Sequence, residues 1–312
     1  MNFDTSAARP SSLLRPLHLS LKVRDALFGY VFVGPMVVGF VLTVLLPLVA
    51  VFLYSFQDRN MLTGTWQYVE SANYQNILGG DPLFTKVLIN SLVFTLGLVP
   101  LNVVLALVLA VLLNRAIRGV TFFRTLFFAP VVTSAAAWAI VWKFILQGEN
   151  GTLNLLLDSV GIDGPNWLRD GNWAMFSVIF TRALKNVGLN MIILLAALQS
   201  IPREYDEAAQ VDGATAFDRF RRITVPLLSP TILLVTVLTV VGSLKVFDHI
   251  VLMTNGGPSN ATMVLVNYIY FQAFKVFDTG YASALAVILF AIALVATLTQ
   301  WFLRKRFVYS EV

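Results

Sequence analysis

The sequence has no cysteine and little charge. The absence of cysteine from all 312 residues excludes disulfide bonds, thiolate metal sites and a cysteine nucleophile. Only 12% of the residues are charged, whereas an ordinary soluble domain has about a quarter, and 57% are apolar. This composition indicates a polytopic membrane protein.

Histidines are scarce and a phosphate-binding loop is missing. His18 and His249 are the only histidines, which is too few for a histidine metal site or a histidine-based catalytic group. No G-x-x-x-x-G-K-[ST] pattern occurs, so the chain is not expected to bind or hydrolyse ATP. We therefore expect no catalytic residue, no metal site and no cofactor on this chain.

Long apolar runs are abundant. A helix needs about 20 apolar residues to cross roughly 30 Å of hydrocarbon. The predicted fold is all-α with six transmembrane helices, over 27–55, 87–113, 122–146, 174–199, 227–250 and 281–303. Prolines fall inside these runs at positions 35, 47, 100 and 130, and we expect kinks there.

The basic residues predict the orientation in the membrane. Of the 22 lysines and arginines, 14 lie in the N-terminal tail, the 114–124 loop, the 203–222 segment and the C-terminus. Because cytoplasmic loops retain positive charge, we expect these segments and both termini in the cytoplasm. The cations cluster at the ends of apolar runs, so the net charge of +5 does not indicate a nucleic-acid partner.

Four segments follow from this topology. The first apolar run is too long for the apolar region of a cleaved signal peptide, so we expect it to remain as a helix. The segments are a cytoplasmic tail over 1–26, a first transmembrane helix with a periplasmic loop over 27–86, a core of five helices over 87–303 and a cytoplasmic C-terminus over 304–312.

A charged segment, EYDEAAQVDGATAFDRFRRITVPLL, interrupts the apolar chain from Glu204 to Leu228. Its composition predicts two short helices joined by a turn at Gly213, with Thr215 capping the second helix. Apolar residues on the second helix recur at the spacing of one helix face, which favours a helix lying along the membrane surface. Pro226 then marks the return into the membrane.

The same segment carries a family resemblance. Glu207-Ala208-Ala209, Gly213 after three residues, Ile223 after nine, and Val225-Pro226 after one resemble the EAA loop of the membrane subunits of binding-protein-dependent ABC importers. Val225 stands where that family prefers leucine. Residues 118–146, 188–214, 246–262 and 29–56 also resemble the carbohydrate-uptake branch, the permeases for maltose and glycerol phosphate. The likeness covers roughly residues 27–303.

The resemblance implies a type I ABC importer permease fold and a coupling role. The loop over 203–226 would dock on a separate ATPase, with Glu207 pairing with a basic group, Ala208 and Ala209 permitting close contact, and Gly213 making the turn. It also implies several partners in the bacterial inner membrane: a second permease subunit in a heterodimer, an ATPase homodimer that holds ATP and Mg, a periplasmic or lipid-anchored substrate-binding protein, and membrane lipid.

Polar residues inside the apolar runs are candidates for the substrate pathway. Four of them fall within roughly 140° of one face of helix four at about 100° per residue: Arg182, Lys185, Asn186 and Asn190. The alternative is that such groups hold helices together through hydrogen bonds. The two cations favour a wet cavity and permit an anionic or phosphorylated sugar.

Other polar positions give weaker signals. Asn90 and Ser91 are further pathway candidates. The 254–262 loop has the turn-forming residues Gly256, Gly257 and Pro258 and is expected to face outward. In similar permeases the outer loops receive the substrate-binding protein, so the resemblance implies a docking or gating role for this loop. Lys245 and Asp248 are spaced to form a local ion pair. An ion-coupled secondary transporter is the main alternative, but Asp248 is the only acidic residue inside any of the six runs. A membrane-embedded enzyme is a third possibility, which no nucleophile or metal cluster supports.

Overall fold

The computed structural model describes residues 21–114 and 118–307. Most of the predicted N-terminal tail, residues 115–117 of the 114–124 loop and residues 308–312 of the C-terminus lie outside the described residues. Residues up to Ala50 and residues from Val51 onward form two units, and each is described by itself.

A long apolar helix begins in the first unit and ends at Tyr54. α1 spans Leu21–Phe40 and continues through the π-helical turn η1, Val41–Leu45, into α2, Leu46–Tyr54. In this turn Leu46 N donates to Val41 O, directly before Pro47, which has no N–H to donate. The stretch Phe28–Tyr54 is long and apolar enough to cross a membrane, in agreement with the first predicted crossing.

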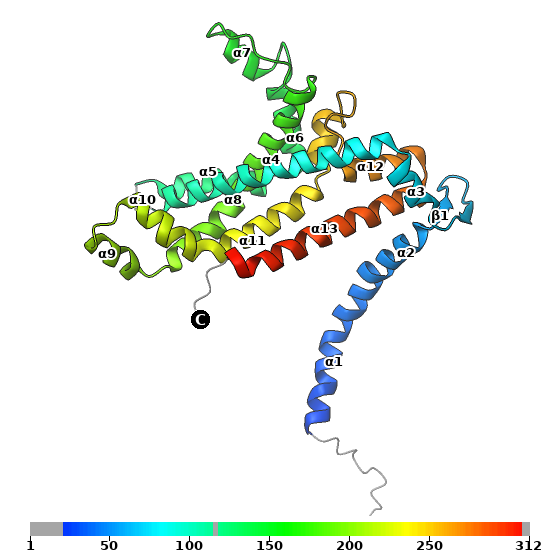
Figure 1. Cartoon of the computed structure of the whole chain (residues 1–312), viewed down its shortest axis with the longest axis horizontal. Helices are drawn as coiled ribbons and strands as arrows, with labels where there is room; N and C mark the ends of the chain where they lie inside the picture. Colours follow the sequence, from blue (N-terminus) through cyan, green and yellow to red (C-terminus); the bar gives the residue numbers. More distant parts are fainter. Residues whose placement is uncertain (1–20, 115–117, 308–312) are drawn as a thin grey trace, which may run out of the picture. The chain divides into compact units, whose positions relative to one another are not determined.

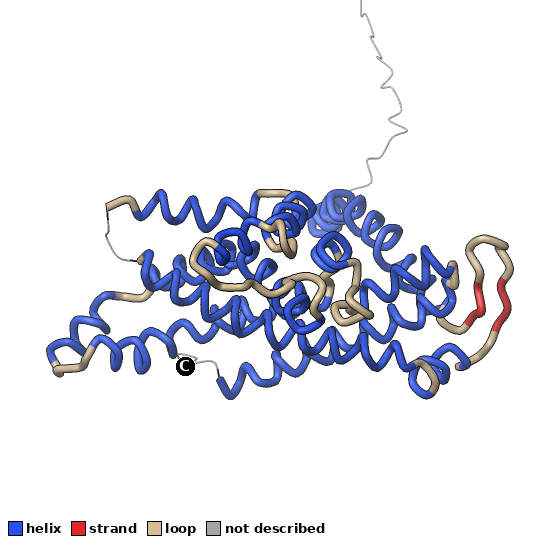
Figure 2. The backbone as a smooth tube through the Cα atoms, turned by 90° about the horizontal axis from the view of Figure 1, so that it is seen from above, coloured by secondary structure: helices blue, strands red, loops and turns tan. Residues whose placement is uncertain are grey.

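Four long helices run side by side in the second unit (Figure 1). They are α4, Pro82–Leu113; α8, Gly171–Ser200; α11, Val225–Leu244; and α13, Thr279–Phe307. One end of this bundle carries the strands β1, Gln57–Arg59, and β2, Trp66–Tyr68, with α3, Ala72–Gly79, and α12, Leu265–Phe271. The opposite end carries α9, Arg203–Val211, and α10, Ala216–Arg219 (Figures 1 and 2).

The described residues contain one short β-hairpin in an otherwise helical fold. Its two strands pair antiparallel, with Gln57 opposite Tyr68 and Arg59 opposite Trp66. At Gly280, near the start of α13, an added Cβ would lie 1.9 Å from Gln57 O, so the hairpin backbone rests directly on that helix. The fold class is the expected all-helical one apart from this hairpin.

α8 is the centre of the bundle. Of its most apolar stretch 61% is buried, against 28% for α4 and 22% for α13. Its buried face packs on α4 and α11 through Val187, Met191 and Leu194 against Ala106, Ala110 and Val235. Substitution of Gly188 would place a Cβ 2.1 Å from Phe127 O, so the backbones of α8 and α5 touch at this point.

The predicted crossing over 122–146 is interrupted shortly after Pro130, where the sequence predicted a kink, and the interruption is a complete break of the helix. The chain forms α5, Val120–Val132, and α6, Ala135–Ile145, whose axes differ by 103°. Pro130 contributes no N–H to the last turn of α5, and Thr133 Oγ1 donates to Pro130 O at 2.7 Å, a local bond that competes with continuation of the helix. α6 and the short α7, Thr152–Asp158, project from the bundle (Figure 1).

The predicted surface helix before Pro226 is also wrong. α10 continues through the π-helical turn η2, Phe220–Thr224, into α11, so Ala216–Leu244 is one helix. Val225 N donates to Phe220 O directly before Pro226, as Leu46 does before Pro47. In both places the widened turn accommodates a proline without ending the helix. Pro35 and Pro100 lie inside helices that continue on both sides of them.

The expected helix over 227–250 breaks before its end. α11 ends at Leu244, Lys245–Phe247 are not helical, and the chain becomes helical again at Asp248 before η3, Ile250–Thr254. η4, Gln272–Val276, follows α12. Five helices of the described residues are long and apolar enough to cross a membrane, and the bent pair α5–α6 makes six when it counts as one crossing.

The contact between α5 and α8 predicts a stability effect at Gly188. Gly188→Ala places a Cβ against the Phe127 backbone, so we expect a loss of roughly 1–3 kcal/mol from overpacking and a lower melting temperature in detergent. The measurement is the thermal unfolding of the purified protein.

Gly242→Ala is the matched control, because it makes the same change in the helix α11 with nothing within 4 Å of the new Cβ. It gains helix propensity without a clash and should melt no lower than the wild type. Equal melting temperatures for the two variants would contradict the close α5–α8 contact.

Candidate functional site

The turn between α9 and α10 is a closed helix terminus. Gly213 has φ +78°, in the left-handed region that favours glycine. Gly213 N donates to Gln210 O at 3.0 Å, and Ala214 N donates to Ala209 O at 2.9 Å. These two bonds form a Schellman motif, which satisfies the last carbonyls of α9. The predicted short helix before Gly213 and the glycine turn are present, whereas the predicted second short helix is the start of the continuous helix Ala216–Leu244.

Side chains brace the same turn from both helices. Arg219 Nε lies 3.4 Å from Asp206 Oδ1, an ion pair that joins α10 to α9. Thr215 caps α10, because its Oγ1 accepts from Asp218 N at 3.2 Å. An exposed ion pair contributes only about 0.2–1 kcal/mol, but together with the cap it fixes the angle between the helices.

The motif residues divide between surface and interior. Glu207, Ala208 and Gly213 are exposed, whereas Ala209, Ile223 and Pro226 are half-buried. Beside them the exposed apolar side chains of Val211 and Phe217 extend the surface. An end of the bundle with exposed acidic, small and apolar groups on a braced turn is suited to docking against another protein.

Lys185 is bound to the broken helix. Its Nζ donates to Pro130 O and to Thr133 O, each at 2.8 Å, at the carboxyl end of α5. Only 6% of the residue is exposed. A cation at a helix C-terminus satisfies free carbonyls and interacts favourably with the helix dipole. Lys185 therefore stabilises the break between α5 and α6.

Asn190 belongs to a buried network between three helices. Its Nδ2 donates to Asn102 Oδ1 on α4 and, at 3.0 Å, to Thr239 Oγ1 on α11. Asn102 Nδ2 in turn donates to Ala183 O on α8 at 2.9 Å. Sequence reasoning missed Asn102 and Thr239, although both are polar residues inside apolar runs, which is the signal that identified Asn190.

Arg182 lies against the segment that follows the break in α11. Its Nη1 is 3.9 Å from Asp248 Oδ2 and 3.4 Å from His249 Nδ1. The Arg182 side chain is 16% exposed, the Asp248 side chain 39%, and His249 is fully buried. Asp248 therefore pairs with a residue of α8 and not with Lys245, which is exposed; the local pair expected from their spacing is wrong.

The four predicted pathway residues of α8 thus have different surroundings. Lys185 contacts α5, Asn190 contacts α4 and α11, and Arg182 contacts Asp248 and His249. Asn186 is half-buried, and its side chain forms no hydrogen bond with a described residue. Of these four side chains, Arg182 and Asn186 have the fewest hydrogen bonds to the backbone or to the buried network.

Asn90 and Ser91 hold the 254–262 loop, which we call the outer loop after its predicted position. Asn90 Nδ2 donates to Asn260 O at 2.8 Å and to Met263 O at 3.0 Å, and Ser91 Oγ accepts from Leu265 N. Lys86 Nζ donates to Ser259 O at 2.6 Å in the same way. These contacts fasten the loop to α4, and the pathway assignment of Asn90 and Ser91 stays a prediction.

The outer loop itself is compact. Gly256 has φ +82°, and an added Cβ would lie 3.1 Å from Asn267 Oδ1, so this position requires glycine. The loop continues through Gly257 and Pro258, and buried Thr262 donates from Oγ1 to Gly257 O at 2.8 Å. The loop is tied to its own base, and its docking role stays a prediction.

A carboxylate near the outer loop joins α4 to α12 and α13. Asp81 caps α4 by accepting from Leu83 N, and its Oδ2 accepts from the Tyr268 and Tyr281 hydroxyls at 2.6 Å each. Burial raises the pKa of Asp81, but these hydrogen bonds outweigh it and leave the pKa below its usual range. Burial and the bond to Asp81 raise the pKa of Tyr268 to about 12, so the phenol stays a donor.

Among the described residues, no group of three or more His, Asp and Glu side chains has the arrangement of a metal site. The polar clusters described above are pairs and networks between helices.

Comparison with known proteins identifies the family of the chain. The family described as "Binding-protein-dependent transport system inner membrane component" matches residues 102–309. The lactose transport system permease protein LacF of Rhizobium radiobacter is 33% identical over 293 residues, covering 91% of this chain and 96% of that protein. The multiple sugar-binding transport system permease protein MsmF of Streptococcus mutans is 37% identical over 256 residues, covering 81% and 87%.

A solved structure shares the fold. One chain of a bacterial alginate ABC transporter, crystallised in complex with an alginate pentasaccharide-bound periplasmic protein, matches with a TM-score of 0.81 and 24% identity. The match covers 95% of this chain and 100% of that chain. At this identity the likeness shows the architecture of the helices.

The contact of Lys185 with the broken helix predicts a stability effect. Lys185→Met keeps the apolar stem but removes two charge-assisted hydrogen bonds, which leaves the Pro130 and Thr133 carbonyls without that donor. We expect a loss of roughly 1–3 kcal/mol, measured as a lower melting temperature in detergent.

Lys245→Met makes the same change at an exposed lysine and serves as control. It should leave the melting temperature near that of the wild type. A Lys185→Met variant as stable as this control would show that the α5–α6 break does not need the ammonium group.

Proposed function

Because the chain belongs to the family of binding-protein-dependent transport system inner membrane components, we propose that it forms the translocation pathway of an ATP-driven importer and is moved by a separate ATPase. The chain is a permease subunit of a sugar ABC importer in the inner membrane, as the matched family and the sugar permeases among its relatives indicate. How this subunit is coupled to ATP hydrolysis is what we propose.

The braced turn between α9 and α10 is the observation that supports coupling through residues 203–226. Exposed Glu207 supplies a charge for a basic group on the ATPase, and Ala208 permits close approach. Because α10, η2 and α11 form one helix over Ala216–Leu244, a force on this turn passes directly into the membrane. Ile223 and Pro226 lie within that continuous helix.

The assembly follows from the same family. A binding-protein-dependent system includes a substrate-binding protein. We further propose a second permease subunit in a heterodimer, an ATPase homodimer that holds ATP and Mg, and surrounding membrane lipid. α13 runs from the strand end of the bundle towards the end with α9 and α10, which supports a cytoplasmic C-terminus (Figure 1). Six crossings would place the N-terminus on the same side.

The substrate class depends on Arg182. Lys185 is committed to carbonyl groups, so Arg182 is the cation of α8 that a solute could meet. We propose a sugar or sugar derivative, with an anionic or phosphorylated sugar as the specific candidate that Arg182 favours. A substrate carboxylate or phosphate would compete with Asp248 for the guanidinium.

An ion-coupled secondary transporter is not favoured. Such a protein needs a carboxylate in the membrane core that binds the coupling ion, and Asp248 is paired with Arg182. The relatives are permeases of transport systems, which supports a non-catalytic subunit.

A double substitution tests the coupling proposal. Glu207→Ala with Ala209→Glu removes the charge and replaces the small side chain, and loss of an interfacial charge pair typically costs about 2–5 kcal/mol. We expect uptake and substrate-stimulated ATPase activity of the reconstituted complex to fall at least about tenfold, while the amount of chain in the membrane is unchanged.

Asp25→Ala is the control, since it removes an exposed acid of α1 that lies outside residues 203–226. It should retain activity. Wild-type substrate-stimulated ATPase activity in the double variant would contradict the coupling proposal.

Arg182→Gln tests the substrate class. If the guanidinium binds an anionic sugar, the ratio of affinities for anionic over neutral sugars should fall about tenfold in the variant. The measurement is competition between the two kinds of sugar for uptake by reconstituted vesicles.

Asp248→Asn removes the competing carboxylate and should move the same ratio in the opposite direction. Unchanged selectivity in both variants would remove the anionic substrate from the proposal and leave the neutral sugars.

A further inference from the structure

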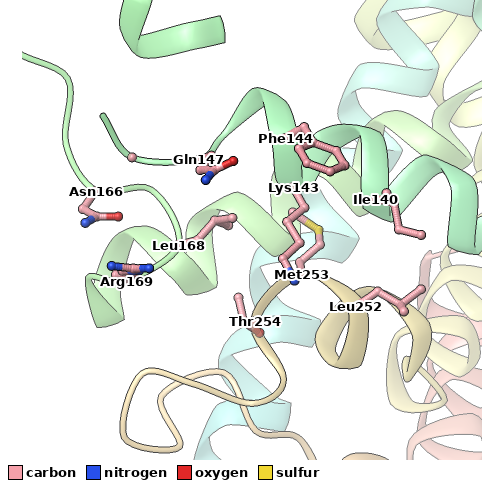
Figure 3. Close-up of a pocket in the computed structure, with 11 residues that line it drawn as sticks. Ile140, Lys143, Phe144, Gln147, Asn166, Leu168, Arg169, Leu252, Met253 and Thr254 are labelled. Carbon is pink, nitrogen blue, oxygen red and sulfur yellow. The ribbon is translucent and has the colours of Figure 1, made fainter. Parts of the chain in front are cut away.

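A pocket lies between α6, the segment before α8, and η3. Its volume is 560 Å³. Lys143, Phe144 and Gln147 of α6 and the residues that follow it line one side, Asn166 and Arg169 line another, and the η3 residues Leu252, Met253 and Thr254 close it (Figure 3). This volume is in the range of small-molecule sites.

The charges that line the pocket are all positive. Lys143 and Arg169 form no ion pair with a described residue, and no acidic side chain lines the pocket. Glu149 lies in an adjoining cavity of 230 Å³ that Arg169 also lines, and Asp158 and Asp163 line a further one of 270 Å³. The acidic groups of this region are therefore gathered outside the pocket.

A buried asparagine holds the wall of the pocket in shape. Asn154 is 6% exposed, and its Nδ2 donates to Gly148 O at 3.1 Å and to Pro165 O at 3.2 Å. Trp167 Nε1 donates to Asn154 Oδ1 at 2.6 Å, and Ser177 Oγ of α8 donates to Trp167 O. The segment that carries Asn166 and Arg169 is thus fixed to α8 without a ligand.

The pocket adjoins the polar groups of α8. Met253, part of its lining, accepts from Thr181 Oγ1 at a distance of 3.4 Å, and Thr181 precedes Arg182 in α8. α8 begins at Gly171 beside the pocket and ends at Ser200 next to α9, so the pocket lies at the end of α8 opposite the coupling turn. In the predicted topology this is the outer side of the membrane.

We propose that this pocket is an outer binding site for an acidic saccharide, which occupies it before reaching Arg182. Lys143 and Arg169 bind the carboxylate or phosphate, Gln147 and Asn166 bind hydroxyl groups, and the exposed ring of Phe144 packs on the apolar face of the sugar. This inference rests on the proposed import function and adds a site to it that does not depend on the coupling turn.

The test is direct binding of trigalacturonate to the purified complex of permease and ATPase subunits without its binding protein, in phosphatidylcholine nanodiscs, by equilibrium dialysis. Both cations are exposed, so water screens each of them, and we expect each of Lys143→Gln and Arg169→Gln to weaken binding roughly three- to tenfold. The double variant should lose more than either single variant, while binding of neutral maltotriose stays unchanged.

Lys275→Gln is the control, because Lys275 is an exposed lysine of η4 outside the pocket lining. It should bind trigalacturonate like the wild type. Wild-type affinity in the double variant, or no binding by the wild-type complex, would overturn the inference. So would a double variant that loses affinity for phosphatidylglycerol but keeps trigalacturonate, because the pocket would then be a lipid site.

Stimulation of the ATPase by the binding protein loaded with its own sugar is measured on the same preparations. Retention of this stimulation in the double variant, with an altered trigalacturonate affinity, supports the inference. If the wild-type complex shows no stimulation, the proposed import function fails whatever the pocket binds. If stimulation is normal and the pocket variants bind like the wild type, the import function stands and only the pocket inference fails.

Discussion

The bond between the Lys185 ammonium group and the carbonyls at the end of α5 is the contact on which the rest of the structure depends. In a hydrocarbon environment a helix can break only where other groups satisfy its free backbone atoms. Lys185 supplies that donor at Pro130 and Thr133, and Gly188 lets α5 lie directly on α8. The 103° bend that follows turns α6 out of the bundle and so creates a wall for the pocket beside it.

A second helix break also contacts α8. α11 ends at Leu244, and the segment that follows brings Asp248 and His249 to Arg182, one turn before Lys185 on α8. Two interrupted helices are therefore held by two cations on neighbouring turns. The buried bonds of Asn190 with Asn102 and Thr239 fix the register of α4, α8 and α11 about one turn farther along. α8 thus connects the pocket end to the coupling end as one continuous element.

The features that could be predicted from the sequence are those whose causes are local. Apolar length indicated the crossings, and Gly213 with Thr215 indicated the turn and cap, because αL geometry and capping involve residues within a few positions. Pro130 indicated a kink near the end of α5, but neither the size of this bend nor the break after Leu244 could be predicted, since the groups that stabilise them, Lys185 and Arg182, are distant in the sequence. The π turns before Pro47 and Pro226 were missed because an ordinary proline rule expects a kink or a helix end.

The polar face of α8 shows why intramembrane charge alone does not identify a substrate. Of the four side chains that share this face by sequence, Lys185 and Asn190 bond to the fold itself. The Arg182 side chain is 16% exposed and the Asp248 side chain 39%, so a solute can reach both members of the pair. A neutral sugar could use that carboxylate as a hydroxyl acceptor, whereas an anionic sugar must displace it, and the displacement subtracts from its affinity. Selectivity at this layer is therefore set by the balance within the Arg182–Asp248 pair and not by the number of cations on the helix.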